Sequence, residues 1–321
     1  KWPKELERTS DPAQQQPGPP KVSDPLKVAL VIPVHNRRET TLQALRSLSR
    51  IDRSGIAVRI FVVDDGSSDG TSEAIAKLFR DVTIVKGDGT LHYAGGTNLG
   101  IEAAAEWEAD HFLLMNDDSV FHESFLVRLV ETAEKNPRSV VGALLLLWDA
   151  PHKVFQVGQV WRTFRDGWQI PDDLTAFNVP KEAFTVECLV GNCTLVPAAA
   201  VKECGVLDAA NFPMGWGDAQ YFMRLRKAGW TLLIEPRAYV WCEPNTYPAP
   251  LHEQGIRRVF SVLFLDQRHP SNFKRQFQAR WHSAPNRGAA VAAFSVYILK
   301  IVGKSLSFGL RKLFRVGGRQ R

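Results

Sequence analysis

One segment fixes the fold that we expect: Val62-Val63-Asp64-Asp65-Gly66-Ser67-Ser68-Asp69-Gly70-Thr71. Its apolar beginning completes a predicted strand at 58–63, and its end opens a predicted helix at 70–80. Carboxylates between a strand and a helix can hold a ribose hydroxyl or the N–H of a nucleotide base. The same side chains can instead form a turn in which Asp and Ser cap the helix. Taken alone, the segment leaves both interpretations open.

The residues around this segment alternate between short apolar runs and helical stretches. Upstream and downstream we expect strands at 28–34, 82–86 and 111–115, with helices at 40–50 and 97–107. This alternation is typical of βαβ units and a mainly parallel sheet. The later part is less regular, with predicted helices at 122–136 and 219–228, a strand at 140–147, and short strands around 154–161 and 185–196. We expect this second half to complete one mixed sheet.

A second acidic segment, Asn116-Asp117-Asp118, follows the predicted strand at 111–115. In an open α/β sheet, ligands bind beyond the carboxyl ends of the strands, where loops converge with helix N-termini. Two adjacent carboxylates are unfavourable there unless water or a cation compensates them, and hard oxygen ligands suit Mg²⁺ or Mn²⁺. Such an ion would neutralise charge on a departing nucleoside diphosphate. The alternative is that Asp117 or Asp118 caps the helix at 122–136.

A third carboxylate, Asp218, stands just before the predicted helix at 219–228. A helix N-terminus favours the ionised carboxylate, which is the state in which a general base accepts a proton from a hydroxyl. An ordinary N-cap is the alternative interpretation. Trp216 is close by in the sequence and is expected to face the acceptor, because aromatic faces pack against pyranose rings.

Taken together and in this order, the segments resemble those of family 2 glycosyltransferases of the GT-A fold. The resemblance covers about residues 27–283, and it is carried by Val31–Arg37, Val62–Thr71, Tyr93–Ile101, Asn116–Asp118, Gly191–Pro197 and Asp218. It implies an α/β protein with a single Rossmann-like mixed sheet flanked by helices. It also implies an inverting enzyme of a rhamnosyltransferase-like subgroup.

The resemblance assigns roles to individual residues. Those implied in nucleotide-sugar binding are Pro33, His35, Asn36, Arg37, Asp64, Asp65, Gly95, Gly96, Asn98, Asn116 and Asp117. Those implied on the acceptor side are Gly191, Asn192, Trp216 and Gly217, and Asp218 matches the catalytic base. The chain departs from the family pattern at Asn116, at Asn192-Cys193, and at Gly217 and Gln220 beside the base.

The resemblance further implies a bound Mn²⁺ or Mg²⁺. Asp118 is the candidate for direct contact with the metal, and Asp117 is the second carboxylate. Many relatives carry a His where this chain has Cys242. Because a thiolate is a soft ligand, the remaining positions fall to Cys242, to His252 or to additional water. A buried, inert cysteine is the alternative interpretation of Cys242.

Charge is distributed unevenly along the chain. The net charge is +6, but residues 284–321 hold eight Lys or Arg and no Asp or Glu, which leaves 32 basic and 34 acidic residues elsewhere. This pattern argues against a nucleic-acid partner for the body of the protein. We therefore expect a disordered, proline-rich leader at 1–25, a GT-A domain at 26–283 and a basic amphipathic helical tail at 284–321.

The tail has two interpretations. Lys300, Lys304, Ser307, Arg311 and Arg315 form a polar stripe opposite Phe294, Ile298, Ile301, Leu306 and Leu313, which suits an anionic membrane surface. Alternatively, the tail packs on the domain with a solvated basic face. The apolar run is too short to span a bilayer. The four cysteines show no C-x-x-C spacing and no signal peptide is evident, so we expect a cytoplasmic protein, peripheral on the inner face of the cell membrane.

The expected function is transfer of a sugar from a UDP, GDP or dTDP donor to a saccharide or lipid-linked acceptor, in bacterial surface polysaccharide or glycolipid synthesis. A catalytically silent GT-A-like module that binds a nucleotide sugar or a glycan is the alternative, motivated by Asn116, Gly217, Gln220 and Cys242. A nucleotidyltransferase is disfavoured, because no Gly-rich phosphate loop follows the first strand.

Overall fold

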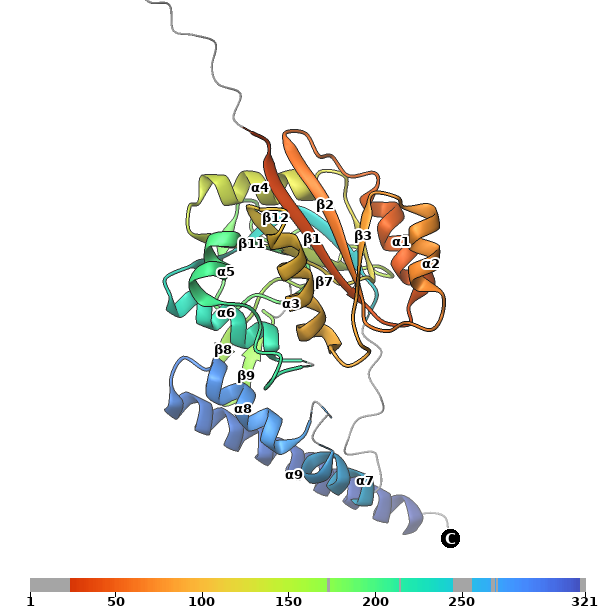
Figure 1. Cartoon of the computed structure of the whole chain (residues 1–321). Helices are drawn as coiled ribbons and strands as arrows, with labels where there is room; N and C mark the ends of the chain where they lie inside the picture. Colours follow the sequence, from red (N-terminus) through yellow and green to blue (C-terminus); the bar gives the residue numbers. More distant parts are fainter. Residues whose placement is uncertain are drawn as a thin grey trace, which may run out of the picture.

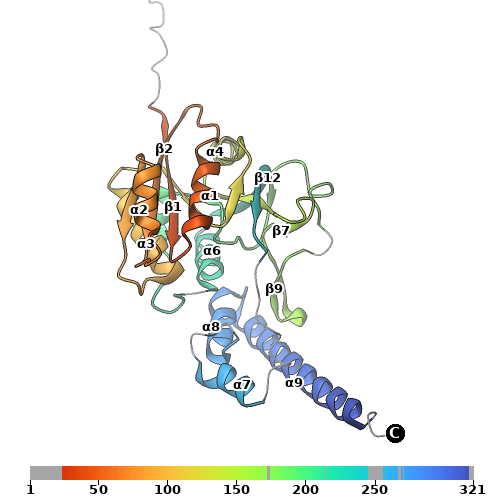
Figure 2. The ribbon, with the colours of Figure 1, turned by 90° about the vertical axis from the view of Figure 1, so that its right-hand side faces the viewer.

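The computed structural model describes residues 24–171, 174–213, 215–244, 256–266, 269 and 271–317. All but the last two residues of the predicted leader 1–25 lie outside the described residues. One sheet with helices on both faces forms the main body, and a group of C-terminal helices lies at one end of it (Figures 1 and 2).

The N-terminal half is the βαβ array that the sequence predicts. Its four parallel strands lie in the order β4-β1-β2-β3, with bounds β1 Leu26–Val34, β2 Ile56–Asp64, β3 Val82–Lys86 and β4 His111–Leu114. β1 is apolar at almost every position because both of its faces are covered, which is usual for central parallel strands. Leu30 and Ile32 face one core cluster, whereas Ala29 and Val31 face the other.

Three helices cover each face of the sheet. On the side of Leu30 lie α1 Arg38–Leu48, α2 Thr71–Leu78 and α4 Phe125–Lys135. On the side of Val31 lie α3 His92–Ala105, α5 Ala198–Cys204 and α6 Gly217–Lys227. The sheet therefore separates two core clusters, and the loops at its strand ends lie next to both layers of helices.

The second half completes the sheet, as expected. The order β10-β12-β6-β11 continues from β4, with bounds β6 Ser139–Leu147, β10 Phe184–Thr185, β11 Thr194–Pro197 and β12 Thr231–Cys242. β11 is antiparallel to both neighbours, β12 runs parallel to β6, and the sheet is therefore mixed. Two short strands lie off this path: β5 Ser119–Phe121 pairs with β12, and β7 Val154–Gln156 pairs with β6.

Among the differences from the prediction, three concern elements that lead to the candidate site. β12 was not predicted, because Glu235-Pro236-Arg237 interrupts its apolar pattern; in the structure the register with β6 shifts between Glu235 and Tyr239 to accommodate them. α3 begins at His92 rather than at 97, so the glycines at 95 and 96 are helical. The expected strand at 185–196 is divided into β10 and β11, with irregular chain between them.

The C-terminal part is helical. Its elements are α7 Ile256–Phe260, the π-helical turn η3 Ser261–Leu265, α8 Phe273–Ser283 and α9 Arg287–Gly317, and α9 continues through Gly303 without a break. α8 and α9 dock on the hairpin of β8 Val160–Arg162 and β9 Gly167–Gln169, which are joined by the 3-10 turn η1 Thr163–Arg165. The Arg280 Nε of α8 donates to the Asp166 carbonyl at 2.9 Å, and the Trp168 indole donates to Ser283 Oγ at 2.9 Å.

α9 confirms the predicted C-terminal helix, but part of the apolar face that was predicted to contact lipid packs inside the protein. Phe294, which the sequence placed on a lipid-facing stripe, packs against Phe273 and Phe277 of α8 at ring-centroid distances of 6.1 and 5.3 Å. Lys300 pairs with Asp166 at 3.3 Å. Among the described helices, none combines the length and the apolar character needed to cross a bilayer.

Candidate active site

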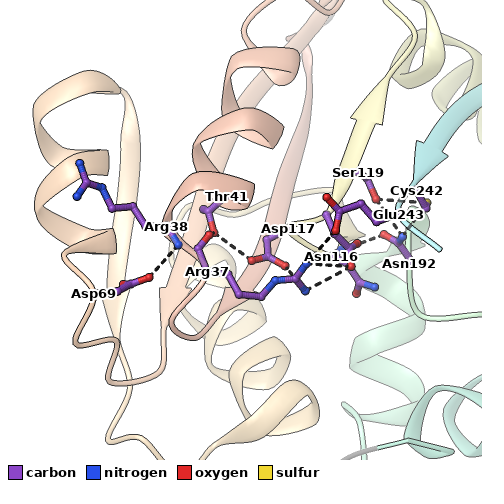
Figure 3. A network of polar contacts seen from close by, with 11 residues as sticks. Arg37, Arg38, Thr41, Asp69, Asn116, Asp117, Ser119, Asn192, Cys242 and Glu243 are labelled. Atoms are coloured by element: carbon purple, nitrogen blue, oxygen red, sulfur yellow. Dashed lines mark hydrogen bonds and ion pairs between the residues drawn. The ribbon is translucent and has the colours of Figure 1, made fainter. Parts of the chain in front are cut away.

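The loops after β1 and β2 form one hydrogen-bonded platform at the carboxyl ends of the strands. The Nδ1–H of His35 donates to the Asp65 carbonyl at 2.6 Å, and Asn36 Oδ1 accepts from the Ser68 backbone N–H at 2.8 Å. The Arg38 backbone N–H donates to Asp69 Oδ2 at 2.9 Å, as Figure 3 shows. The structure therefore brings the predicted donor-side residues His35, Asn36 and Asp65 together. Their hydrogen bonds connect the loop after β1 to the loop after β2.

Asp64 is a structural carboxylate rather than a free ligand. It is 1% exposed and accepts hydrogen bonds from the Ser67 backbone at 2.9 Å, from the Ser72 hydroxyl, and from Lys86 Nζ at 3.2 Å. Burial alone would raise the pKa of Asp64, but the hydrogen bonds outweigh burial and lower it. The sequence-based assignment of Asp64 to nucleotide-sugar binding is therefore not supported by its geometry.

Asp65 organises the next loop along the chain. Its Oδ1 accepts from the Gly89 backbone N–H at 2.8 Å, and its Oδ2 accepts from the His92 backbone N–H at 3.0 Å. A carboxylate oxygen can accept more than one hydrogen bond, so each oxygen keeps capacity for a ligand. Asp65 thus fixes the entrance of α3 and retains the chemistry that a ribose or a base would need.

Arg37 reaches across to the second acidic segment. Its Nη1 lies 3.2 Å from Asp117 Oδ1 and 3.3 Å from Asp118 Oδ2, and its Nη2 lies 3.9 Å from Glu243 Oε2. Figure 3 shows the Arg37 side chain extended towards Asp117 and Glu243. Thr41 Oγ1 donates to the other oxygen of Asp117 at 3.0 Å. Neither aspartate side chain caps α4, so the simple helix-cap interpretation is wrong.

The two neighbouring carboxylates differ in accessibility. The side chain of Asp117 is 6% exposed and that of Asp118 is 19% exposed. Burial raises the pKa of Asp117 to about 6; Arg37 opposes the increase, and the Asp118 charge adds to it. Asp118 is thus the carboxylate that an incoming ion meets first, and Asp117 lies behind it.

Asn192 ties the acidic segment to the end of β12. Its Oδ1 accepts from the Asn116 backbone N–H at 2.9 Å, and its Nδ2 donates to Ser119 Oγ at 3.1 Å and to Cys242 Sγ at 3.5 Å. Cys242 is 1% exposed, and burial raises the pKa of its thiol to about 12. A buried, protonated thiol is a poor partner for Mn²⁺. The inert interpretation of Cys242 therefore fits the structure, and thiolate ligation does not.

The chemistry of the remaining donors fits a divalent cation. Within the described ranges, no three His, Cys, Asp or Glu side chains are grouped so as to hold a metal alone. Enzymes that act on diphosphates commonly bind Mg²⁺ through one or two carboxylates and complete the shell with water and substrate phosphates. Asp118 and Asp117 provide that minimal set of hard oxygen ligands. His252, the other candidate from the sequence, lies outside the described residues.

Asp218 is held at the start of α6 by backbone donors. Its Oδ2 accepts from the Gly191 N–H at 3.0 Å, and its Oδ1 accepts from the Ala219 N–H at 2.8 Å. Burial raises the pKa of Asp218, and the two backbone hydrogen bonds only partly oppose the increase. A carboxylate with a raised pKa is a stronger base, and one held at two points is well oriented. The geometry goes beyond an ordinary cap, because this carboxylate also opens into a cavity.

That cavity has a volume of about 190 Å³ and lies between α3, α6 and the end of β4. Its wall includes Asn116, Gly191, Asn192, Gly217 and Asp218, which were all predicted as site residues, together with Tyr93, Ala94, Gln156, Val190, Phe212 and Gly215. Donor-side and acceptor-side candidates thus meet in one space. Trp216 does not line it and lies beneath the Arg280 guanidinium of α8 at 5.9 Å.

Several glycines of the site serve close packing. A Cβ on Gly191 would lie 2.6 Å from the Tyr93 hydroxyl and 3.2 Å from Asp218 Cβ, so glycine at this position lets both side chains pack against the backbone. A Cβ on Gly96 would lie 2.9 Å from Pro33 Cβ, and one on Gly217 would lie 3.0 Å from the Phe212 carbonyl oxygen. A Cβ on Gly95 would meet Leu91 of the preceding turn at 3.2 Å. Pro33, Gly95 and Gly96 therefore set the position of α3, and their contacts with a ligand stay a prediction.

Asn98 also has a structural role. Its Nδ2 donates to the Leu207 carbonyl at 2.8 Å, and its Oδ1 accepts from the Leu207 N–H at 3.0 Å. The two bonds fasten α3 to the segment that leads to α6. The assignment of Asn98 to nucleotide-sugar binding stays a prediction, and the structure shows that Asn98 helps to position the segment that leads to Asp218.

Three residues of the site were missed from the sequence. Tyr93 donates its hydroxyl to the Gly191 carbonyl at 2.8 Å, Gln156 lines the Asp218 cavity, and Glu243 joins the Arg37 network. Glu243 directly follows Cys242, so its position beside the presumed metal ligand was a usable signal. Gln156 sits in a short strand after an irregular segment, and nothing in the local pattern marks it.

This chain is similar to known proteins both in sequence and in fold. The model of the family described as "Glycosyl transferase family 2" matches residues 29–184. The chain is 26% identical over 287 residues to the N-acetylglucosaminyl-diphospho-decaprenol L-rhamnosyltransferase of Mycobacterium tuberculosis, in two strains, covering 82% of this chain and 89% of that protein.

Solved structures support the fold. The structure of GalNAc-T7 with UDP, GalNAc and Mn²⁺ matches with a TM-score of 0.58 and 14% identity, over 82% of this chain and 52% of that chain, so this chain spans about half its length. S. aureus TarS 1-349 matches with a TM-score of 0.53 and 12% identity, over 85% of this chain and 71% of that chain. The same TarS fragment in complex with UDP gives a TM-score of 0.51.

A mixed sheet of this topology, shared with these solved glycosyltransferase structures, is the GT-A fold. The match of residues 29–184 to the family 2 model, together with the similarity to the mycobacterial rhamnosyltransferase, supports a family 2 glycosyltransferase of the rhamnosyltransferase-like type. The enzyme predicted from the sequence is confirmed, and a catalytically silent binding module is not favoured.

Proposed function

We propose that this enzyme transfers a sugar with inversion of configuration from a nucleotide-diphosphate sugar to a hydroxyl of a saccharide acceptor. One observation carries the proposal: the Asp218 carboxylate opens into the same cavity as Asn116, the residue that begins the acidic segment. The Asp218 carboxylate and the first residue of the acidic segment therefore share one space, with Asp117 and Asp118 next along the chain. The Asp218→Asn variant, discussed below, tests this assignment.

The reaction is a single displacement. Asp218 accepts the proton of the acceptor hydroxyl through one of its two carboxylate oxygens as the hydroxyl oxygen attacks the anomeric carbon. The bond from that carbon to the diphosphate breaks, and the nucleoside diphosphate leaves with the bonding electrons. The Gly191 and Ala219 N–H groups keep the carboxylate oriented throughout.

Asp118 and Asp117 would hold Mn²⁺ or Mg²⁺, which when bound neutralises charge on the leaving diphosphate. Arg37 lies against both carboxylates and presents a planar guanidinium suited to phosphate oxygens. Asp65 lies beside the same platform and is placed to accept from a ribose hydroxyl or a base N–H. Together these residues orient the donor for the displacement.

The proposed acceptor is a lipid-linked saccharide of bacterial surface polysaccharide or glycolipid synthesis. The support is the similarity to the mycobacterial rhamnosyltransferase, whose name specifies a diphospho-decaprenol acceptor, across 82% of this chain. Rhamnose, galactofuranose and common hexoses all remain candidate donor sugars, with UDP, GDP or dTDP as the nucleotide.

Donor binding should depend on both metal and pH. We expect Mn²⁺ together with one of the UDP-, GDP- or dTDP-sugars to raise the melting temperature, because a ligand bound only to the native state stabilises it. Since the Asp117 pKa of about 6 exceeds that of an ordinary carboxyl, protons compete with the metal as pH falls through that value. Thermal shifts at pH 7.5 should therefore exceed those at pH 5. Equal shifts with and without Mn²⁺ would contradict the metal assignment.

We also propose peripheral contact with the inner face of the cell membrane through α9 and η1. Val291, Leu299 and Val302 fall on one face of α9 by helical spacing, and they are 49%, 70% and 48% exposed. Phe164 of the adjoining η1 turn is 86% exposed. Lys304 is exposed nearby in the sequence. Exposed apolar side chains on a segment rich in Lys and Arg suit an anionic lipid surface.

Point variants test this contact better than truncation, because removing α9 would expose Phe273 and Phe277. The Phe164→Ser, Leu299→Ser double variant should sediment less with phosphatidylglycerol vesicles than the unaltered chain, by about tenfold in partition coefficient. Phe177→Ser is the matched control, since Phe177 is 85% exposed and belongs to another part of the fold. Equal sedimentation of the double variant and the control would refute the membrane proposal.

A further inference from the structure

A groove on the α1 side of the sheet meets the proposed active site only at Asp118 and Glu243, and the mechanism uses none of its other lining residues. It consists of a cavity of about 560 Å³ between α1, β5 and the ends of β6 and β12, and an adjoining cavity of about 90 Å³. The two cavities share Gln43, Val120 and Trp148. We call them together the Trp148 groove.

One wall of the Trp148 groove is aromatic. Trp148 is 50% exposed although it directly follows the buried strand β6, and its backbone N–H donates to the Cys242 carbonyl at 2.9 Å. Trp241 and His122 line the same wall, with ring centroids 6.3 Å apart. Tyr239 lies behind them, 6.5 Å from Trp241 in a stacked arrangement. The backbone hydrogen bond therefore fixes the position of Trp148, and half of its side chain remains exposed to solvent instead of packing in the core.

The opposite wall carries planar polar side chains. Gln43 and Arg46 line the groove from one face of α1, and Arg50 lines it from the turn that follows the helix. Their amide and guanidinium groups have no hydrogen-bond or ion-pair partner within the part of the chain that the structure describes. Glu123, exposed at the rim, adds a carboxylate. Donors and an acceptor therefore face an aromatic surface across an open space.

This combination matches the chemistry of a sugar ring. The C–H face of a pyranose packs on an indole, and vicinal hydroxyls pair with the forked ends of Arg, Gln and Glu. A purely apolar ligand would leave three polar side chains buried without partners, which is costly. A nucleotide diphosphate is served by the donor platform at the strand ends. The groove therefore favours a saccharide.

The groove reaches the active site without being part of it. Asp118 and Glu243 line its smaller cavity, while the Asp218 cavity has no residue in common with either of the two. α1 and α6 cover opposite faces of the sheet. A chain of several sugars passing the strand ends can therefore contact both regions.

We propose that the Trp148 groove is a second saccharide-binding site, which holds sugar residues of the acceptor or product glycan away from the reacting hydroxyl. This inference rests on the proposed function for the identity of the glycan but not for the binding itself. The site contributes affinity for longer glycans and does not alter the chemical step.

The test measures binding of free oligosaccharides by the full chain. The probes are di- to hexasaccharides containing rhamnose, galactose, glucose or N-acetylglucosamine, presented on an array and then titrated in solution with tryptophan fluorescence as readout. We expect at least one to bind, and Trp148→Ala to weaken its Kd about tenfold. Arg46→Ala provides a second variant, with a smaller loss expected. Phe177→Ala, an exposed aromatic outside the groove, should bind like the unaltered chain.

The outcomes separate this site from the catalytic one. Asp218→Asn should bind the same oligosaccharide normally, so loss of transfer with retained glycan binding leaves the inference standing. Absence of binding to every probe overturns it, as does binding that neither Trp148→Ala nor Arg46→Ala weakens. Saturable binding of a peptide or lipid in the groove, competing with no glycan, would also overturn it.

Discussion

Replacing Asp218 with Asn is expected to lower the rate of sugar transfer by about 100- to 10,000-fold, the usual contribution of a general base. Asn cannot accept the acceptor proton, yet it keeps the size of the side chain and one oxygen for the Gly191 or Ala219 N–H. Donor binding, measured by thermal shift with Mn²⁺, should persist. Transfer is measured by release of the nucleoside diphosphate in a coupled assay.

The matched control for Asp218→Asn is Asp81→Asn, an exposed aspartate outside the site, which should transfer at the normal rate. If Asp218→Asn transfers sugar at the normal rate, another residue must be the base.

The pH dependence of transfer gives a second check on Asp218. Because burial raises the pKa of Asp218, activity of the unaltered enzyme should begin to fall at a higher pH than an ordinary aspartate would give.

Replacing Asp118 with Ala is expected to remove metal-dependent donor binding and to lower transfer by at least about 100-fold, since a metal supplies several kcal/mol of charge stabilisation. Asp118 is the more accessible carboxylate of the pair, and Asp117 is committed to Thr41 and Arg37. The measurement is the Mn²⁺ dependence of both the thermal shift and transfer.

Cys242→Ser is the informative control for Asp118→Ala. Serine can replace the thiol in its contacts with Ser119 and Asn192, so Mn²⁺ dependence should remain unchanged. If Cys242→Ser loses its response to Mn²⁺ while Asp118→Ala keeps it, the metal assignment made from the two carboxylates is wrong.

The parallel half of the fold could be predicted because each of its strands is marked by the apolar residues within that strand. A strand buried on both faces reads as an unbroken apolar run, and β1, β2 and β4 all show such a run followed by polar loop residues. β12 could not be predicted in this way. Its Glu235 is fully buried but satisfied by Thr132, at 2.6 Å, and by Arg237, and those bonds form only in the folded chain.

The candidate site shows the same division. The chemistry of Asp117, Asp118 and Asp218 follows from residue type and order, and the structure brings the segments that carry them together. The roles of Asn98 and Gly96 depend on which distant backbone lies opposite them, Leu207 and Pro33, and no spacing along the sequence contains that information. Ligand-like residues at a site are thus often the ones that build it.

The contact of Arg37 with Asp117 and Asp118 has a consequence for the order of assembly. Adjacent carboxylates repel each other, and without a counter-charge their burial would oppose folding. Here the counter-charge is the guanidinium of Arg37, which is part of the same chain. Asp117 and Asp118 can therefore reach their folded positions with no ion supplied from solution. Occupation by a divalent ion would then be an exchange of partners, in which the guanidinium would give up carboxylate oxygens and become free for the phosphates that arrive with the ion.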